Sequence, residues 1–213
     1  MKISFKNVMP QHLADVQHDA DSIWGNSFQI EAQSKVVLNA SSGKGKTTFT
    51  TTLLGIRNNY SGDIHFGDVA LKSLSKEDWA TYRSSKIAVV YQDLQLFPEL
   101  TVLENLEIKN QLHKTFSESE LQNMLDELGV GNKTHERCAN LSLGQQQRVA
   151  IIRALCQPFQ WIILDEPFSH LDAENARKSL ALIDRICDQE KAGFILTTLG
   201  DFYGYNYQVE LKL

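Results

Sequence analysis

The stretch KVVLNASSGKGKTTFTTTLL, residues 35–54, decides the fold of this chain. The apolar residues 36–38 are followed by small residues and glycines, and then by a run without Pro or Gly that can form a helix up to Gly55. A strand, a glycine-rich loop and a helix in this order form a phosphate cradle, because backbone N–H groups and the positive end of the helix dipole face one anion. The residues predicted to form the cradle are Ser41, Ser42, Gly43, Lys44, Gly45, Lys46, Thr47 and Thr48.

Two residues of this loop have specific predicted roles. Lys46 is placed to reach the β- and γ-phosphates of a nucleotide, and the Thr47 hydroxyl is placed to coordinate Mg²⁺. The pattern GxxxxGK followed by Ser or Thr has one departure, because Ala40 stands in place of its first Gly. Alanine fits there if its φ is negative. The alternative explanation is a glycine-rich turn that only links a strand to a helix.

Composition limits the class of protein. The 213 residues suit one compact domain with a real core, and the net charge of −5 provides no general attraction to nucleic acid or anionic lipid. The three cysteines form no CxxC pair, which is typical of free thiols in a reducing compartment. The N-terminus lacks the apolar core of a signal peptide, and no stretch approaches the roughly 18 apolar residues of a membrane span. These features predict a soluble, cytoplasmic protein that reaches a membrane only through a partner.

Strand-like and helix-like patterns alternate along the chain. Strands are predicted at residues 3–8, 28–30, 35–38, 63–66, 86–91, 161–164, 193–198 and 208–213, with a turn at 58–63. Helices are predicted at 75–82, 117–128, 143–156 and 172–190, and residues 93–140 are helical in character as a whole. This alternation around a phosphate loop predicts one α/β domain with a mostly parallel sheet covered on both faces.

A second motif joins the apolar residues 161–164 to two acids, Asp165 and Glu166. A buried strand of this kind delivers its acids to the carboxyl edge of a sheet, where nucleotide sites lie. Asp165 is suited to hold Mg²⁺ through water, and Glu166 to polarise an attacking water. The alternative is a strand that ends in solvated acids.

A third motif, NLSLGQQQR, spans residues 140–148. Its Ser hydroxyl and Gly N–H lie at a predicted helix start, which makes a second terminus suited to an anion. A capped, glutamine-rich helix without a ligand has a similar sequence. The motif alone therefore leaves both interpretations open.

The phosphate loop, the LSxGQ segment and the apolar strand ending in Asp-Glu, in this order, resemble the ATP-binding-cassette (ABC) family. The resemblance implies a P-loop NTPase core with a mostly parallel sheet, an antiparallel β lobe and an inserted helical lobe at about residues 93–145. It also implies ATP and Mg²⁺ as cofactors. The segment LFPELTVLEN, residues 96–105, is similar to the ATPases of the lipoprotein-release, macrolide-efflux and cell-division type.

The resemblance assigns further site residues. Gln92 matches the glutamine that contacts Mg²⁺ and faces the coupled partner, and it joins Glu166 and Lys46 as the expected catalytic set. Residues 169–172, with the sequence SHLD, match the D-loop of the family, with Asp172 in the usual acidic place. In this family two subunits sandwich two ATP molecules, so that the LSxGQ segment of one subunit caps the γ-phosphate held by the other. The residues expected there are Ser142, Gly144 and Gln145.

This sequence also departs from the family pattern. The family usually has a His after the last core strand, where this chain has Leu199, and Leu cannot hydrogen-bond a phosphate. Leu143 stands where Gly is commoner. The usual adenine-stacking aromatic residue is absent, and His12 lies nearest to its position. We therefore expect nucleotide binding with slow turnover.

The expected function is an ATPase subunit that drives a membrane transporter or a membrane-spanning mechanical device. It would form a homodimer or heterodimer on polytopic permease subunits at the cytoplasmic face of the membrane, without inserting into it. One alternative is a soluble ABC ATPase without transport that acts in cofactor assembly or on nucleic acid. The acidic charge argues against nucleic acid. Another is a nucleotide-binding scaffold with little turnover, which Leu199 favours and the intact Lys46, Thr47, Asp165 and Glu166 oppose.

Overall fold

The computed structural model describes residues 1–41 and 43–213, which form two sheets and a group of helices. A parallel sheet contains, in spatial order, β6 (Ile87–Val90), β7 (Trp161–Asp165), β8 (Gly193–Thr198), β3 (Lys35–Asn39) and β9 (Val209–Lys212). An antiparallel sheet contains β2 (Phe28–Ile30), β1 (Ile3–Pro10), β4 (Tyr60–Phe66) and β5 (Val69–Ala70). The predicted α/β fold with a parallel and an antiparallel sheet is confirmed.

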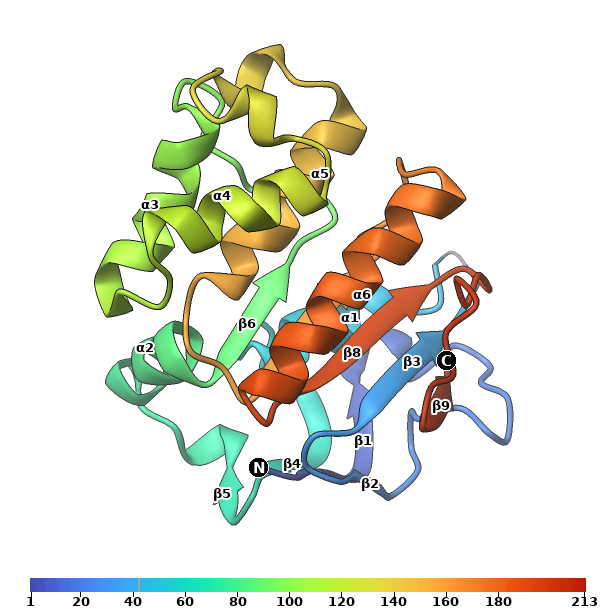
Figure 1. Ribbon diagram of the computed structural model, residues 1–213. Helices are drawn as coiled ribbons and strands as arrows, with labels where there is room; N and C mark the ends of the chain where they lie inside the picture. The colour runs from blue at the N-terminus through green and yellow to red at the C-terminus, as the bar shows by residue number, and fades with distance from the viewer. Residues whose placement is uncertain (42) are drawn as a thin grey trace.

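Six α-helices complete the described part of the fold, and Figure 1 shows α6 crossing the parallel sheet while α3 and α4 lie together beyond β6. Three helices begin at a reciprocal Ser/Thr–acid capping box that satisfies the free N–H groups of the first turn: Ser75 with Asp78, Thr101 with Glu104, and Ser117 with Glu120. The helices are α1 (Lys46–Leu53), α2 (Lys76–Ser85), α3 (Val102–His113), α4 (Glu118–Glu127), α5 (Leu143–Leu155) and α6 (Ala173–Gln189).

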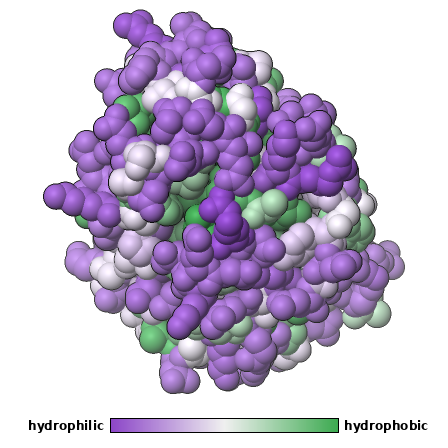
Figure 2. Space-filling view, viewed as in Figure 1, coloured by the Kyte–Doolittle hydropathy of each residue, from purple (hydrophilic) through white to green (hydrophobic). Residues whose placement is uncertain are grey.

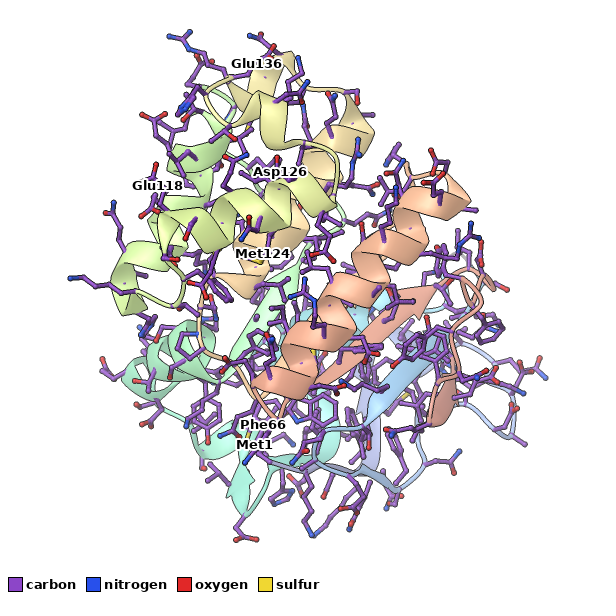
Figure 3. The ribbon with its side chains drawn as sticks, in the orientation of Figure 1. Met1, Phe66, Glu118, Met124, Asp126 and Glu136 are labelled. Carbon is purple, nitrogen blue, oxygen red and sulfur yellow. The ribbon has the colours of Figure 1, made fainter. Side chains whose placement is uncertain are left out.

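The parallel sheet separates two hydrophobic clusters. Alternate side chains of β3 point to opposite faces, so Val37 packs in one cluster while Val36 and Leu38 pack in the other. The first cluster contains apolar residues of α3, α4, α5 and α6, and the second contains those of α1 and the antiparallel sheet. In Figure 3 the labels on Glu118, Met124 and Asp126 mark α4, and those on Met1 and Phe66 mark the opposite end of the molecule. Figure 2 shows that the face in view is mostly hydrophilic.

One predicted turn is wrong. Residues 60–63 belong to β4, where they pair with β1, and only residues 57–59 precede the strand without regular structure. The turn-forming composition is accommodated by a register shift between Lys6 and Met9 on β1. Pairing with a distant strand has therefore overridden the local turn signal.

The carboxyl ends of four neighbouring strands carry the predicted site residues. The phosphate loop follows β3, Asp165 ends β7, Gln92 follows β6, and Leu199 follows β8. The three cysteines are buried and unpaired, as predicted. Across the residues that the structure describes, no helix combines the length and apolar character needed to cross a membrane.

Candidate active site

Loops from the four strand ends line one cavity of about 480 Å³. It joins the phosphate loop to residues that follow β6, β7 and β8, which are far apart in sequence. Such a hollow at the carboxyl edge of a parallel sheet is the usual place for a nucleotide. The lining residues are Gly43, Gly45, Lys46, Thr47, Thr48, Gln92, Glu166 and Leu199.

Lys46 is the central charge of the cavity. Its Nζ donates to the backbone carbonyls of Ala40 at 2.9 Å and Ser41 at 3.2 Å, and it forms an ion pair with Glu166 Oε1 at 3.3 Å. The side chain is 6% exposed. The loop therefore curls around a buried ammonium group, which is suited to bind phosphate oxygens. Ala40 has a negative φ, so the departure at this position is compatible with the loop.

Gly45 is required by two features of the loop. It caps α1 with φ 104°, a region that residues with a side chain rarely adopt. A Cβ atom added there would lie 2.9 Å from Leu13 Cδ1 and 3.2 Å from Trp24 Nε1. The loop backbone thus passes directly over these two side chains, which hold the start of α1 in place.

Asp165 is buried at the end of β7. Burial is the main cause that raises its pKa, and the negative charge of Glu166 adds to it, while the hydroxyls of Thr197, Thr50 and Thr47 oppose the rise. Thr197 Oγ1 donates to Asp165 Oδ1 at 2.9 Å and accepts from the Glu166 N–H at 3.1 Å. One hydroxyl of β8 therefore fixes both acids.

Glu166 has a φ of 48°, which is uncommon for a residue with a side chain. Strained backbone of this kind persists where the surroundings determine it, and it is common at active sites. Here the Thr197 hydrogen bond holds the backbone, and the side chain reaches the Lys46 amine. The carboxylate is therefore held inside the cavity rather than directed into bulk solvent.

The donor set fits Mg²⁺. Mg²⁺ prefers hard oxygen ligands, and Thr47, Asp165 and Gln92 supply a hydroxyl, a carboxylate and an amide oxygen near the phosphate loop. The groups that act on the buried Asp165 are hydroxyls and one like charge, so a cation there would relieve an unfavourable negative charge. The cation would supply charge neutralisation to a bound nucleotide.

Sequence reasoning missed Arg153, which holds the segment after Gln92. Its guanidinium donates to the carbonyls of Leu94 at 2.8 Å and Gln95 at 2.7 Å. Both of these residues have positive φ, at 60° and 51°. Burial lowers the pKa of Arg153, although the side chain stays a cation in any protein. An Arg within the apolar run of α5 was the available signal.

The LSxGQ segment lies outside this cavity and begins α5. The Ser142 hydroxyl accepts from the Gln145 N–H at 3.3 Å, and Gln145 Oε1 accepts from the Ser142 N–H at 2.9 Å. A Cβ on Gly144 would lie 2.8 Å from the His170 carbonyl oxygen, so only glycine allows this approach. The segment is therefore packed directly against the D-loop of its own chain.

The other predicted residues lie around these two places. Asp172 caps α6 by accepting from the Asn175 N–H at 2.8 Å, and this hydrogen bond is the main cause that lowers its pKa. His12 contacts Thr48 Oγ1 at 3.1 Å and Arg57 Nη1 at 3.1 Å through its two ring nitrogens, and it does not line the cavity. Lys44 lies in the phosphate loop but not on the cavity wall, and Ser42 lies outside the described residues.

A family model described as ABC transporter matches residues 24–169 of the chain. The lipoprotein-releasing system ATP-binding protein LolD from Saccharophagus degradans is 31% identical over 82% of this chain and 78% of that protein. The chain belongs to the ABC transporter family. An uncharacterised ABC transporter ATP-binding protein of Mycobacterium tuberculosis is 34% identical over 81% of this ABC chain and 53% of its own length, so the chain spans about half of that relative.

Two solved structures share the fold of this ABC protein. The dimeric structure of MJ0796, a bacterial ABC transporter cassette, is 24% identical, with a TM-score of 0.82 over 99% of this chain and 94% of that one. A putative ABC transporter ATP-binding protein from Pyrococcus furiosus is 20% identical, with a TM-score of 0.79 over 100% of this chain and 98% of that one. The predicted ABC-type ATPase is confirmed at the level of family and fold.

Proposed function

We propose that this ABC protein binds MgATP between two copies of the cassette and hydrolyses it to drive a membrane transporter. The observation that carries the proposal is the single cavity that joins Lys46, at the start of α1, to Gln92 and Glu166, which follow β6 and β7. Lys46 would bind the β- and γ-phosphates, and Thr47, Asp165 and Gln92 would hold Mg²⁺. Glu166 would accept a proton from the attacking water as the bond from the γ-phosphorus to its bridging oxygen breaks.

The dimer follows from the separation of two sets of predicted nucleotide contacts. Ser142, Gly144 and Gln145 do not line the cavity of their own chain, yet they begin a helix whose N-terminus suits an anion. In a two-fold dimer the same surface of each copy can meet the cavity of the other. Ser142 and Gly144 would then cap the γ-phosphate of the second copy.

The transporter role rests on the relatives. LolD is an ATP-binding protein of a lipoprotein-releasing system, and we propose a similar place for this chain beside polytopic permease subunits at the cytoplasmic face of the membrane. Gln92 and the exposed Phe97 lie on the segment expected to face that partner. Co-purification of the tagged protein with a polytopic membrane protein would support this placement. Absence of the tagged protein from membranes that contain a permease encoded by a neighbouring gene would contradict it.

The ATPase and the dimer are tested together by Glu166→Gln. We expect this variant to bind MgATP, to hydrolyse it slowly, and to sediment as a dimer with MgATP but as a monomer without it. Ser142→Arg in the same background should prevent the dimer, because its bulky side chain would fill the space where the Ser142 hydroxyl is proposed to meet the γ-phosphate. A Glu166→Gln protein that stays monomeric in saturating MgATP would contradict a self-sufficient sandwich.

A scaffold with little turnover is the second candidate function. The observation that favours it is the wall of the cavity after β8, where Leu199 is 61% exposed and has no polar atom. Single-turnover hydrolysis separates the two functions. Conversion of bound ATP faster than in Glu166→Gln supports the ATPase, and equal rates support the scaffold.

A further inference from the structure

The cavity has an apolar wall at the end of β8. Leu199 lines it beside Glu166, and no histidine is among the lining residues in the described part of the chain. Transferring a phosphoryl group places negative charge on the γ-phosphate oxygens, which hydrogen-bond donors stabilise. The Leu199 side chain has no hydrogen-bond donor, so this position cannot stabilise that charge.

His170 lies on the surface that carries the LSxGQ segment. Its carbonyl oxygen is so close to Gly144 that no side chain fits between them, and its imidazole is exposed. The fully buried Gln147 of α5 joins the two loops, because its Oε1 accepts from the His170 N–H at 3.0 Å. His170 therefore lies beside the end of α5 that carries Gly144.

A chain of hydrogen bonds orients the imidazole of His170. Because Gln147 Oε1 accepts from the His170 backbone, its Nε2 is the amide donor, and it donates to Ser169 Oγ at 2.9 Å. Ser169 Oγ also lies 3.0 Å from His170 Nδ1, so the Ser169 hydroxyl can donate its hydrogen to that nitrogen. When Ser169 donates in this way, the ring proton lies on Nε2. Within the described residues, that Nε2–H has no hydrogen-bond partner.

We propose that His170 completes the ATP site of a second copy of this chain, with Nε2–H donating a hydrogen bond to the γ-phosphate across from Leu199. This inference rests on the proposed ATP-sandwich dimer and adds a residue to it. His170 donates a hydrogen bond and transfers no proton, so Glu166 remains the base. Each site would then take its cation and base from one copy, and this donor from the other.

The first test compares His170→Ala with His113→Ala, an exposed histidine at the end of α3 that serves as the matched control. We expect His170→Ala to lower kcat about 10²-fold, as for the loss of one preorganised donor, with the KM for MgATP within about twofold. His113→Ala should match the wild type. Adding Leu199→His to His170→Ala, which places an imidazole on the cavity wall itself, should restore most of the rate.

The second test asks whether His170 acts on its own site or on that of the other copy. Mixing equal amounts of His170→Ala and Glu166→Gln gives mixed dimers in which one site has both Glu166 and the His170 of the other chain. If His170 acts across the dimer, the mixture should recover about a quarter of the wild-type rate, because half the dimers are mixed and each has one complete site. If it acts within its own chain, the mixture stays as slow as its components.

The outcomes separate this inference from the proposed function. Wild-type hydrolysis above that of Glu166→Gln, together with an unchanged rate in His170→Ala or no recovery in the mixture, would overturn the role of His170 and leave the ATPase intact. A wild-type rate equal to that of Glu166→Gln would overturn both. Circular dichroism of His170→Ala excludes misfolding as the cause of a lost rate.

Discussion

Lys46 and Glu166 form an ion pair inside the nucleotide cavity, with Nζ and Oε1 3.3 Å apart and the lysine almost fully buried. The amine proposed to hold the phosphates and the carboxylate proposed to act as the base therefore occupy the same small volume. A phosphate bound by Lys46 would lie next to Glu166, so substrate binding and the choice of base are set by one arrangement.

Removing the charge of Lys46 tests its proposed role in binding the nucleotide. Lys46→Ala should weaken MgATP binding at least about tenfold, since a charge-assisted hydrogen bond contributes roughly 1.5–3 kcal/mol. Isothermal titration calorimetry with MgATP measures the change. Lys178→Ala, on the exposed face of α6, is the control and should bind like the wild type. Unchanged affinity in a folded Lys46→Ala protein would rule out this cavity as the nucleotide site.

Leu199 determines the second prediction. Leu199→His should raise kcat, because the residue lines the same cavity as Glu166 and the imidazole adds a donor that leucine lacks. The gain should reach about 10²-fold in the His170→Ala background and be smaller in the wild type, where His170 supplies a donor. Steady-state phosphate release measures both rates. Equal gains in the two backgrounds would show that the two histidines act independently.

Arg153 provides a prediction on the segment after Gln92. Arg153→Met should lower the free energy of unfolding by about 1–3 kcal/mol. The backbone carbonyls of Leu94 and Gln95, two residues with positive φ, would lose their charged hydrogen-bond donor. The half-saturating concentration of Mg²⁺ for hydrolysis should also rise, because the position of Gln92 depends on this segment. Arg185→Met, whose side chain pairs with Glu127 on the surface, controls for the loss of a cation. A variant that loses stability but keeps its Mg²⁺ dependence would separate folding from positioning.

Asp165 gives a prediction with a defined pH dependence. Its pKa in the folded protein is raised above the usual aspartate value of 3.8, mainly by burial, so the folded state binds this proton more tightly than the unfolded state does. The unfolding free energy of the wild type therefore falls as pH rises from about 3.8 through the folded pKa. Asp165→Asn has no carboxyl group at this position, so its unfolding free energy does not fall for this reason. Without Mg²⁺, the variant should gain stability relative to the wild type across that window, as measured by urea denaturation at several pH values.

Mg²⁺ supplies the control for the Asp165 prediction. MgATP should stabilise the wild type more than it stabilises Asp165→Asn, because the variant loses the only carboxylate among the three proposed Mg²⁺ ligands. A stability difference that is the same at every pH would show that the carboxylate is not strained by burial.

Contiguous motifs made most of the site predictable. Lys46 and Thr47 belong to one loop pattern, and Asp165 and Glu166 directly follow one apolar strand, so their local sequence determines where they lie. Leu199 was harder, because its place in the cavity depends on β8 pairing between β7 and β3. The register in which Asp165 of β7 pairs with Thr197 of β8 brings Leu199 to the cavity.

The features that the sequence did not predict depend on contacts between segments that are far apart in the chain. Arg153 reads as a surface-type residue in the sequence, and only the fold brings it to the carbonyl of Leu94. The approach of His170 to Gly144 likewise requires α5 and the D-loop to pack together. Residues 60–63 were misassigned because turn propensity is local, whereas pairing with β1 is not.

In the proposed dimer, helix α5 would connect two nucleotide sites. Its N-terminus carries Ser142 and Gly144, which are proposed to contact the ATP of the second copy. Near its other end, Arg153 donates to the backbone of the loop that follows Gln92 in the same chain. The helix is about 20 Å long and stiff over that length. A shift at one end would therefore move the other end, so that α5 of each copy would couple two active sites in the proposed dimer. Emptying one site would then loosen the glutamine of the next.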